Sequence, residues 1–190
     1  AGPSEMKDAL DDVWQELGLT LETYWERVAF SEMTQMATRM GVYFSAFKGE
    51  VLTEQAVKFA IGDVLVSGRA DRIEIDEDGL ARIIDVKTGK SDVNAKGEEN
   101  AQLAAYQVGV TELGYQTGGA ALLALRSDNS LKVQTAFSKE QMEDTKEFLR
   151  GLGVGLGGPR IMANPEVSRC RSCAFRHVCP AQSDSVRSCE

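Results

Sequence analysis

The stretch "GRADRIEIDEDGLARIIDVKTGK", residues 68–90, reads as two β-strands joined by a tight turn. Apolar and polar side chains alternate on both sides of "EDG" (77–79), and a glycine in this place commonly closes a three-residue hairpin loop in the left-handed conformation. Counting back along both strands from this loop places Asp71 directly opposite Asp85, within about 4.5–5.5 Å at Cβ. The stretch therefore predicts an antiparallel hairpin that brings two carboxylates together.

The second strand of this hairpin carries an acid and a base inside an apolar run. Asp85 and Lys87 are two residues apart, so both side chains lie on the face that also bears Asp71. Two carboxylates this close repel each other unless a proton or a cation lies between them, and oxygen ligands of this kind suit Mg²⁺ or Mn²⁺. An ordinary cross-strand salt bridge on a surface hairpin is the alternative. The apolar flank Ile83-Ile84 favours the metal site, because unpaired charges on a buried strand are costly.

The chain around the hairpin predicts an α/β protein in which helices flank a mixed sheet. Trp14 and Trp25 fall at helical spacing, so we expect both to be packing residues. The sequence does not settle which strands are parallel. The expected elements are helices at 3–18, 20–47, 99–114 and 139–153 and strands at 51–61, 63–75, 80–87, 119–125 and 131–137.

Size and composition are those of one globular domain. The chain has 190 residues, of which 43% are hydrophobic and 26% charged, and its net charge is −8. The negative charge does not exclude a nucleic-acid partner, because a metal-dependent nuclease concentrates carboxylates at its site and bound cations reverse the local sign. No apolar run approaches a membrane span, and the start "AGPSEM" suggests a fragment of a longer chain. We expect one compact domain with a helical segment (1–50), a core (51–160) and a cysteine-rich tail (161–190).

All four cysteines lie between residues 170 and 189. A disulfide framework would spread its cysteines over the fold, so this clustering favours a bound metal or cluster and a cytosolic, cytoplasmic setting. Zinc held by Cys170, Cys173, His177 and Cys179 is one reading of the spacing. Cys189 follows a polar stretch and is expected to be a bystander.

Three motifs together make the sequence recognisable. Gly68-Arg69-Ala70-Asp71-Arg72 matches G-R-x-D-R, residues 85–89 match D-x-K-T-G, and Gln102 with Tyr106 matches Q-x-x-x-Y. This combination resembles the RecB-like branch of the PD-(D/E)xK nucleases. The resemblance implies a restriction-endonuclease-like core with a central mixed β-sheet.

The resemblance also implies roles for individual residues. Asp71, Asp85 and the backbone carbonyl of Val86 would ligate Mg²⁺ or Mn²⁺, and Lys87 would be catalytic. Gln102 and Tyr106 would face the site and the DNA, which one helical face permits because they are four residues apart.

The tail extends the resemblance. "CRSCAFRHVCPAQ" (170–182) has the C-x₂-C-x₅-C-P spacing of nuclease domains that carry a 4Fe–4S cluster, most like the actinobacterial AdnA/AdnB helicase-nucleases. The resemblance implies that Cys170, Cys173 and Cys179 bind this cluster. Relatives also have an upstream cysteine as fourth ligand and an upstream histidine at the metal. The chain has one histidine, His177, inside the cysteine segment, so we expect both partners to precede the fragment.

These features imply a metal-dependent DNA exonuclease domain of an ATP-dependent helicase-nuclease that acts in DNA end resection and double-strand break repair. Its partners would be DNA ends, single-stranded or unwound, and a helicase motor elsewhere in the parent chain or on a partner subunit, because no Walker A sequence occurs here. The alternatives are a catalytically silent DNA- or partner-binding module, a CRISPR-associated-type iron–sulfur nuclease and a zinc-stapled structural domain.

Overall fold

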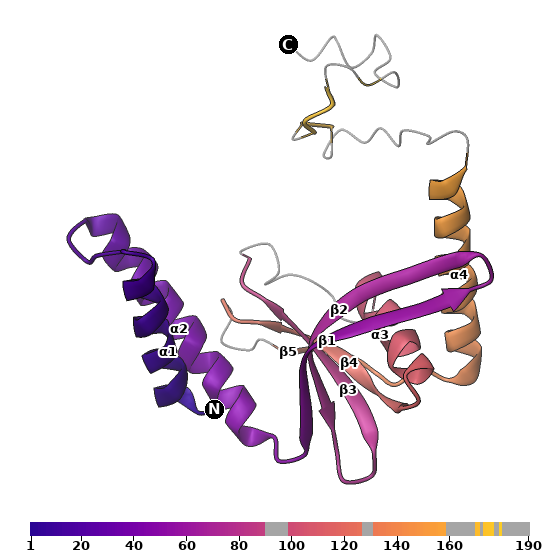
Figure 1. Ribbon diagram of the computed structural model, residues 1–190, viewed down its shortest axis with the longest axis horizontal. Coiled ribbons are helices and arrows are strands. Elements are labelled where there is room, and N and C mark those ends of the chain that lie inside the picture. The colour runs from indigo at the N-terminus through magenta and orange to yellow at the C-terminus, as the bar shows by residue number, and fades with distance from the viewer. Residues whose placement is uncertain (90–98, 127–130, 159–169, 172, 177–178, 180–190) are drawn as a thin grey trace. The chain divides into compact units, whose positions relative to one another are not determined.

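The computed structural model describes residues 1–89, 99–126, 131–158, 170–171, 173–176 and 179. The chain divides into two compact units, Ala1–Arg150 and Gly151–Glu190. The helices are α1 (Pro3–Glu16), α2 (Tyr24–Ala46), α3 (Ala101–Glu112) and α4 (Lys139–Gly157). The strands are β1 (Glu50–Ile61), β2 (Val64–Ile75), β3 (Leu80–Lys87), β4 (Gln116–Ala124) and β5 (Leu131–Gln134), as Figure 1 shows.

The five strands form one mixed sheet in the order β1-β2-β3-β4-β5. β3 and β4 are parallel, and the other neighbours are antiparallel. The parallel pair needs a crossover connection, and α3 lies within it. The predicted α/β fold, with a mixed sheet flanked by helices, is confirmed.

The β2–β3 hairpin has the turn and the register that the sequence predicts. The N–H of Asp76 donates to the carbonyl of Leu80 at 3.1 Å, and Gly79 is left-handed with φ 78°. The paired residues run from Ile75 opposite Ala81 to Arg72 opposite Ile84. The same count continued by one residue aligns Asp71 with Asp85.

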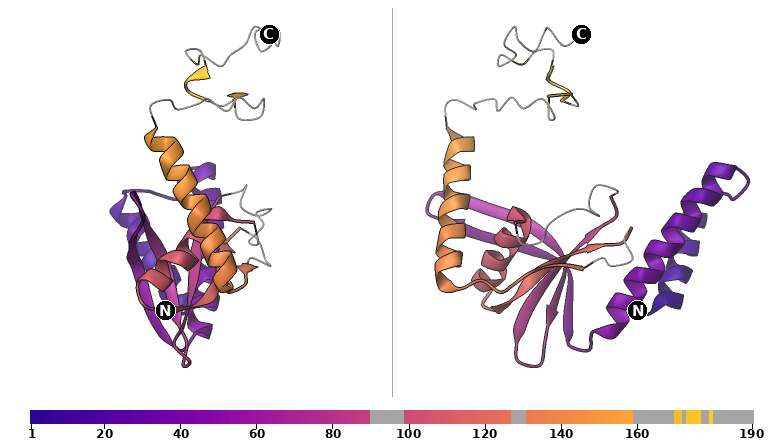
Figure 2. Two further views of the ribbon diagram at one scale, coloured as in Figure 1. Left: turned by 90° about the vertical axis from the view of Figure 1, so that its right-hand side faces the viewer. Right: turned by 180° about the vertical axis from the view of Figure 1, so that it is seen from behind.

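The β1–β2 hairpin is longer and changes direction halfway. Leu52 and Val57 both contact the core that contains α3, although an odd spacing places side chains on opposite faces of a regular strand. Between them, Glu54 has a φ of 51°, and it is the only non-glycine residue with positive φ in the described ranges. Figures 1 and 2 show the distal half of the hairpin turning away from β3 toward α3.

Apolar clusters lie on both faces of the sheet. On one face, strand residues pack against Leu103, Tyr106, Val108 and Val110 of α3 and Met142 of α4. On the other face, Ile84, Ala121, Leu123 and Leu125 pack against Met36, Met40, Tyr43 and Phe44 of α2. The site residues of β3 therefore lie between two helices that fix the strand from either side.

The N-terminal helices form a hairpin in which only one of the two tryptophans is buried. Trp14 is buried and contacts the ring of Phe30 edge-on, with centroids 5.0 Å apart. Trp25 is 75% exposed, so its predicted packing role is wrong. It lies five residues before Phe30, which is about 140° around a helix of 3.6 residues per turn, and therefore faces another side.

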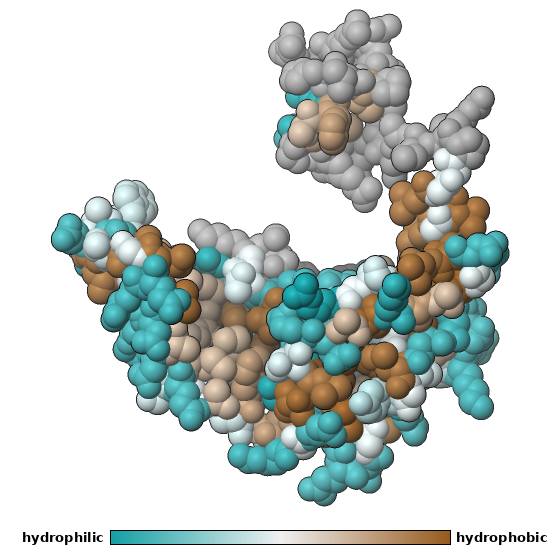
Figure 3. Space-filling model, viewed as in Figure 1, coloured by the Kyte–Doolittle hydropathy of each residue, from teal (hydrophilic) through white to brown (hydrophobic). Residues whose placement is uncertain are grey.

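No helix of the described residues is both long and apolar enough to cross a bilayer. Apolar side chains do lie in the open on α4, where Phe148, Leu152 and Leu156 repeat every four residues. Figure 3 shows the apolar surface of this helix.

Candidate active site

A buried acid and a half-buried base end strand β3. Asp85 is 2% exposed, and Oδ2 of its carboxylate lies 2.7 Å from Nζ of Lys87. Ile83 and Ile84 precede the pair and are fully buried. The ammonium group compensates a carboxylate that would otherwise be costly to remove from water. The Lys87 side chain is 29% exposed, so the pair spans the edge of the core.

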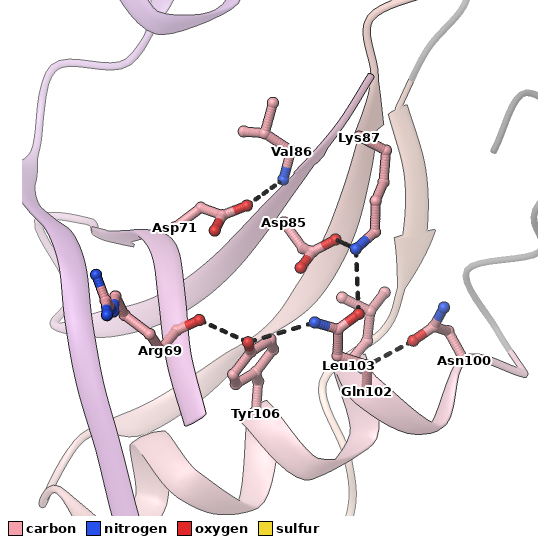
Figure 4. A network of polar contacts seen from close by, with 9 residues as sticks. All are labelled: Arg69, Asp71, Asp85, Val86, Lys87, Asn100, Gln102, Leu103 and Tyr106. Atoms are coloured by element: carbon pink, nitrogen blue, oxygen red, sulfur yellow. Dashed lines mark hydrogen bonds and ion pairs between the residues drawn. The ribbon is translucent and has the colours of Figure 1, made fainter. Parts of the chain in front are cut away.

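Asp71 joins the pair from the neighbouring strand. Oδ2 of Asp71 accepts a hydrogen bond of 2.7 Å from the backbone N–H of Val86, the residue between Asp85 and Lys87 (Figure 4). This contact agrees with the register of the hairpin. The structure therefore brings the two acids and the lysine of the sequence motifs to one place, with Val86 between them.

Helix α3 presents two polar side chains to this group. Its first turn is capped by Asn100, whose side chain accepts from the N–H of Leu103 at 3.0 Å. Nζ of Lys87 donates to Oε1 of Gln102 at 3.2 Å, and Nε2 of Gln102 donates to the hydroxyl of Tyr106 at 3.4 Å. One helical face thus carries both motif residues to the end of β3, as their spacing predicts.

The hydroxyl of Tyr106 completes this row of contacts. It donates to the backbone carbonyl of Arg69 at 2.6 Å, so the row runs from β3 through α3 to β2 (Figure 4). The Arg69 side chain is exposed and pairs with Glu54 at 3.4 Å. The side chain of Glu54 is 65% exposed.

The donor set suits a hard divalent cation. The expected ligands are the carboxylates of Asp71 and Asp85 and the carbonyl of Val86, and Mg²⁺ is usually bound by one or two carboxylates together with waters and substrate phosphate. Among the residues that the structure describes, no three His, Cys, Asp or Glu side chains gather around one point. Asp71 and Asp85 are therefore two candidate ligands for such a cation, and this assignment stays a prediction.

A second polar group, on the opposite face of β2, was not predicted. Nε of Arg72 donates to Oε1 of the buried Glu74 at 2.8 Å, and the hydroxyl of Tyr43 donates to Oε2 at 3.2 Å. The Arg72 guanidinium also lies 4.2 Å from the centroid of the Phe44 ring. Burial, with the Glu74 charge next, raises the pKa of Tyr43 far above its usual value. The group anchors β2 to α2 directly behind Asp71.

Cys170 and Cys173 are linked by one backbone turn, in which the N–H of Cys173 donates to the carbonyl of Cys170 at 3.4 Å. In the part of the chain that the structure describes, these two and Cys179 are free thiols. His177 and Cys189 lie outside the described residues. The cluster assignment of the three cysteines stays a prediction.

The fold and the polar group at the end of β3 define a nuclease-type α/β domain. The family model of the PD-(D/E)XK nuclease superfamily matches residues 1–180, and the chain belongs to this superfamily. Twelve chains of solved structures match, among them "Crystal structure of SSO0001", at 16% identity over 96% of this chain and 86% of that chain, with a TM-score of 0.40. No curated protein matches.

Proposed function

We propose that this chain is a Mg²⁺- or Mn²⁺-dependent DNA exonuclease domain. Membership of the nuclease superfamily supports hydrolysis of a phosphodiester bond in DNA. One observation carries the assignment of the site: an unbroken row of contacts joins Asp85, Lys87, Gln102 and Tyr106, while Asp71 is bonded to the backbone at Val86. All three sequence motifs meet in this row.

Asp71, Asp85 and the carbonyl of Val86 would hold the cation. When bound, the cation would polarise the phosphodiester and lower the pKa of water. The Lys87 ammonium is held between Asp85 and Gln102 at the border of the core, which supports a catalytic role for this side chain. From there it would orient the attacking water and offset the charge that develops on the phosphate.

The two α3 residues act on Lys87 and on the strand behind it. Gln102 fixes the direction of the Lys87 ammonium, which would otherwise sample several rotamers of a long side chain. Tyr106 ties α3 to β2 through the Arg69 carbonyl and so holds Gln102 in place. Both would also contact the DNA strand, as the family resemblance suggests.

The resemblance of the motifs and the tail supports a more specific proposal. The domain would be the nuclease module of an ATP-dependent helicase-nuclease acting in end resection, with a motor in the parent chain or on a partner. Cys170, Cys173 and Cys179 would bind a 4Fe–4S cluster with a fourth ligand from upstream. Iron and sulfide in the purified protein would support this cluster, whereas zinc would overturn it.

The experiment on the site compares Lys87→Ala, Asp85→Asn and the control Lys7→Ala. Lys87→Ala should lower the cleavage rate of a labelled oligonucleotide about 100-fold or more, while Mg²⁺ binding by calorimetry stays near that of the wild type. Asp85→Asn should lose both cleavage and Mg²⁺ binding, because it removes a carboxylate that would hold the cation. Lys7 lies on α1 in an exposed pair with Asp11, so its loss should change neither.

The two variants therefore separate catalysis from metal binding. If Lys87→Ala cleaves DNA at the parent rate, the assigned site is wrong. These measurements belong in the longer protein that restores the expected upstream histidine. If that protein binds DNA and cleaves none with either cation, the domain is a binding module instead.

A further inference from the structure

A pocket of about 320 Å³ lies between the distal half of the β1–β2 hairpin and α3. Its lining residues are Val57, Phe59, Val66, Ser67, Gly68, Gln102, Ala105 and Tyr106. The pocket exists because the hairpin turns toward α3 beyond Glu54, whose left-handed backbone marks the change of direction. The metal and lysine assignments do not account for this pocket, although Gln102 and Tyr106 line it.

Two glycines shape the pocket. Gly109 lets β1 approach α3, because a Cβ at this position would collide with the side chain of Val57. Gly68 lies beside the Tyr106 ring, which lines the pocket although the residue is only 9% exposed, and a Cβ at position 68 would lie 3.5 Å from Cε1 of the ring, at ordinary contact distance. A Cβ at position 68 would therefore make an ordinary contact with Tyr106, and a larger side chain there would take up space in the pocket.

The pocket is continuous with the candidate active site. Gln102 and Tyr106 line it and also belong to the row of contacts that holds Lys87. Figure 4 shows the Tyr106 ring between α3 and the strand that bears Arg69. Part of a substrate bound in the pocket would therefore lie close to a phosphate group bound at Lys87.

The lining selects an uncharged, flat group. The walls are apolar or aromatic, from Val57, Phe59, Val66 and Tyr106, and the polar atoms come from the Ser67 hydroxyl and the Gln102 amide. None of the lining side chains carries a charge, so a phosphate gains nothing there. The volume lies at the lower end of ligand pockets, roughly 300–1,000 Å³, which suits one heterocycle better than a longer ligand.

We propose, on the basis of the proposed function, that this pocket binds the nucleobase next to the scissile phosphate. The base contacts the Tyr106 ring while its own phosphate faces Lys87. Because a base must leave its stack and its partner to enter such a pocket, the site takes unpaired strands, and it takes them with little regard to sequence, since every base offers an aromatic face.

The test uses single-stranded oligonucleotides with one abasic nucleotide at successive positions around the cleaved bond. In the wild type, an abasic nucleotide at one position should raise KM about tenfold, the loss of one base–aromatic contact. Gly68→Val places a side chain in the pocket from β2, and Ala105→Leu does so from α3 with little loss of helix propensity. Both should raise KM for the intact strand to the abasic level, and the abasic nucleotide should then cost nothing further.

Ala101→Leu is the matched control, because Ala101 lies on the same helix outside the pocket and is exposed. It should keep the wild-type preference for the intact strand. If the wild type cleaves intact and abasic strands with equal KM, the proposed base pocket is wrong and the nuclease proposal still stands. The same holds if Gly68→Val and Ala105→Leu both keep the wild-type preference for the intact strand. If the longer protein with the expected upstream histidine cleaves neither strand, the nuclease proposal itself is overturned.

Discussion

The buried side chain of Gln107 offers the sharpest test of how α3 is held. It is 0% exposed, and its amide uses every hydrogen-bonding position it has. Nε2 donates to Oε1 of Gln134 at 2.9 Å and to the carbonyl of Thr135 at 3.0 Å. Oε1 accepts from the hydroxyl of Thr117 at 3.0 Å and from the N–H of Phe137 at 3.0 Å. These bonds tie α3 to β4, to β5 and to the segment that follows β5.

The substitution Gln107→Met keeps the volume and removes all four bonds. The Thr117 hydroxyl can rotate, and the carbonyl of Thr135 belongs to an exposed residue, so these two partners lose little. Oε1 of the buried Gln134 and the backbone N–H of Phe137 lose the bonds that Gln107 makes with them, and each unsatisfied buried group costs about 1–3 kcal/mol. We therefore expect the free energy of unfolding to fall by about 3–4 kcal/mol, a large part of the roughly 5–15 kcal/mol of a typical domain.

Urea denaturation of the wild type and the variant measures this difference. Gln35→Met is the matched control, because Gln35 is exposed on α2 and its replacement should change stability by less than about 0.5 kcal/mol. A loss below about 1 kcal/mol for Gln107→Met would refute the reasoning, since water or a small backbone movement would then satisfy both groups. Nuclease activity should fall with stability, because the Asn100 cap and Gln102 are carried on the same helix.

Two further predictions concern the backbone and the pH dependence of stability. Glu54→Gly should raise the free energy of unfolding by about 1 kcal/mol, because glycine adopts the φ of 51° without the steric cost that other residues have. The exposed ion pair with Arg69, which is lost, contributes little. Equal or lower stability in urea would contradict this prediction. Glu26 accepts from the backbone N–H and then from the hydroxyl of Thr23, which lowers its pKa to about 2 from 4.5, so its stabilising effect is present above pH 4.5 and disappears as the pH falls toward 2. Melting temperatures across this range should fall less steeply for Glu26→Gln than for the wild type, and parallel curves would exclude the effect.

The parts of the fold that were predictable are those in which local chemistry decides the structure. The left-handed Gly79 and the alternation on both strands give the β2–β3 register, because a slip of one residue would turn every buried side chain outward. Ser138 and Gln141 likewise predict the cap of α4, and both cap bonds are present at 3.2 and 2.9 Å. The predicted start of α2 at residue 20 is less accurate, because Thr23 caps the helix and its first residue is Tyr24. Both threonines are plausible caps, and the Glu26 side chain bonds to each.

The parts that were not predictable depend on contacts between distant segments. β3 pairs with β4 in parallel because α3 lies in the connection between them, and no residue in either strand indicates this pairing. Gln107 reads as one more polar residue of a helix until Thr117 and Phe137 are seen beside it. The bend at Glu54 has no local signal either, because a left-handed glutamate within a strand is disfavoured and persists only where the surrounding structure demands it.

The position of Asp85 and Lys87 explains how a strand can be both part of the core and part of the candidate site. Up to Ile84 the strand is closed in by α3 on one face and α2 on the other. Exposure then rises from 2% at Asp85 to 29% at the Lys87 side chain. The carboxylate of Asp85 is therefore shielded from water, where its interaction with a cation is strong, while the ammonium of Lys87 reaches solvent. If the acid and the lysine lay two residues earlier in β3, both side chains would be buried and a DNA strand could not reach them. If they lay two residues later, the strand would no longer be held between α3 and α2. The end of β3 is thus the one stretch of this strand where both requirements are met.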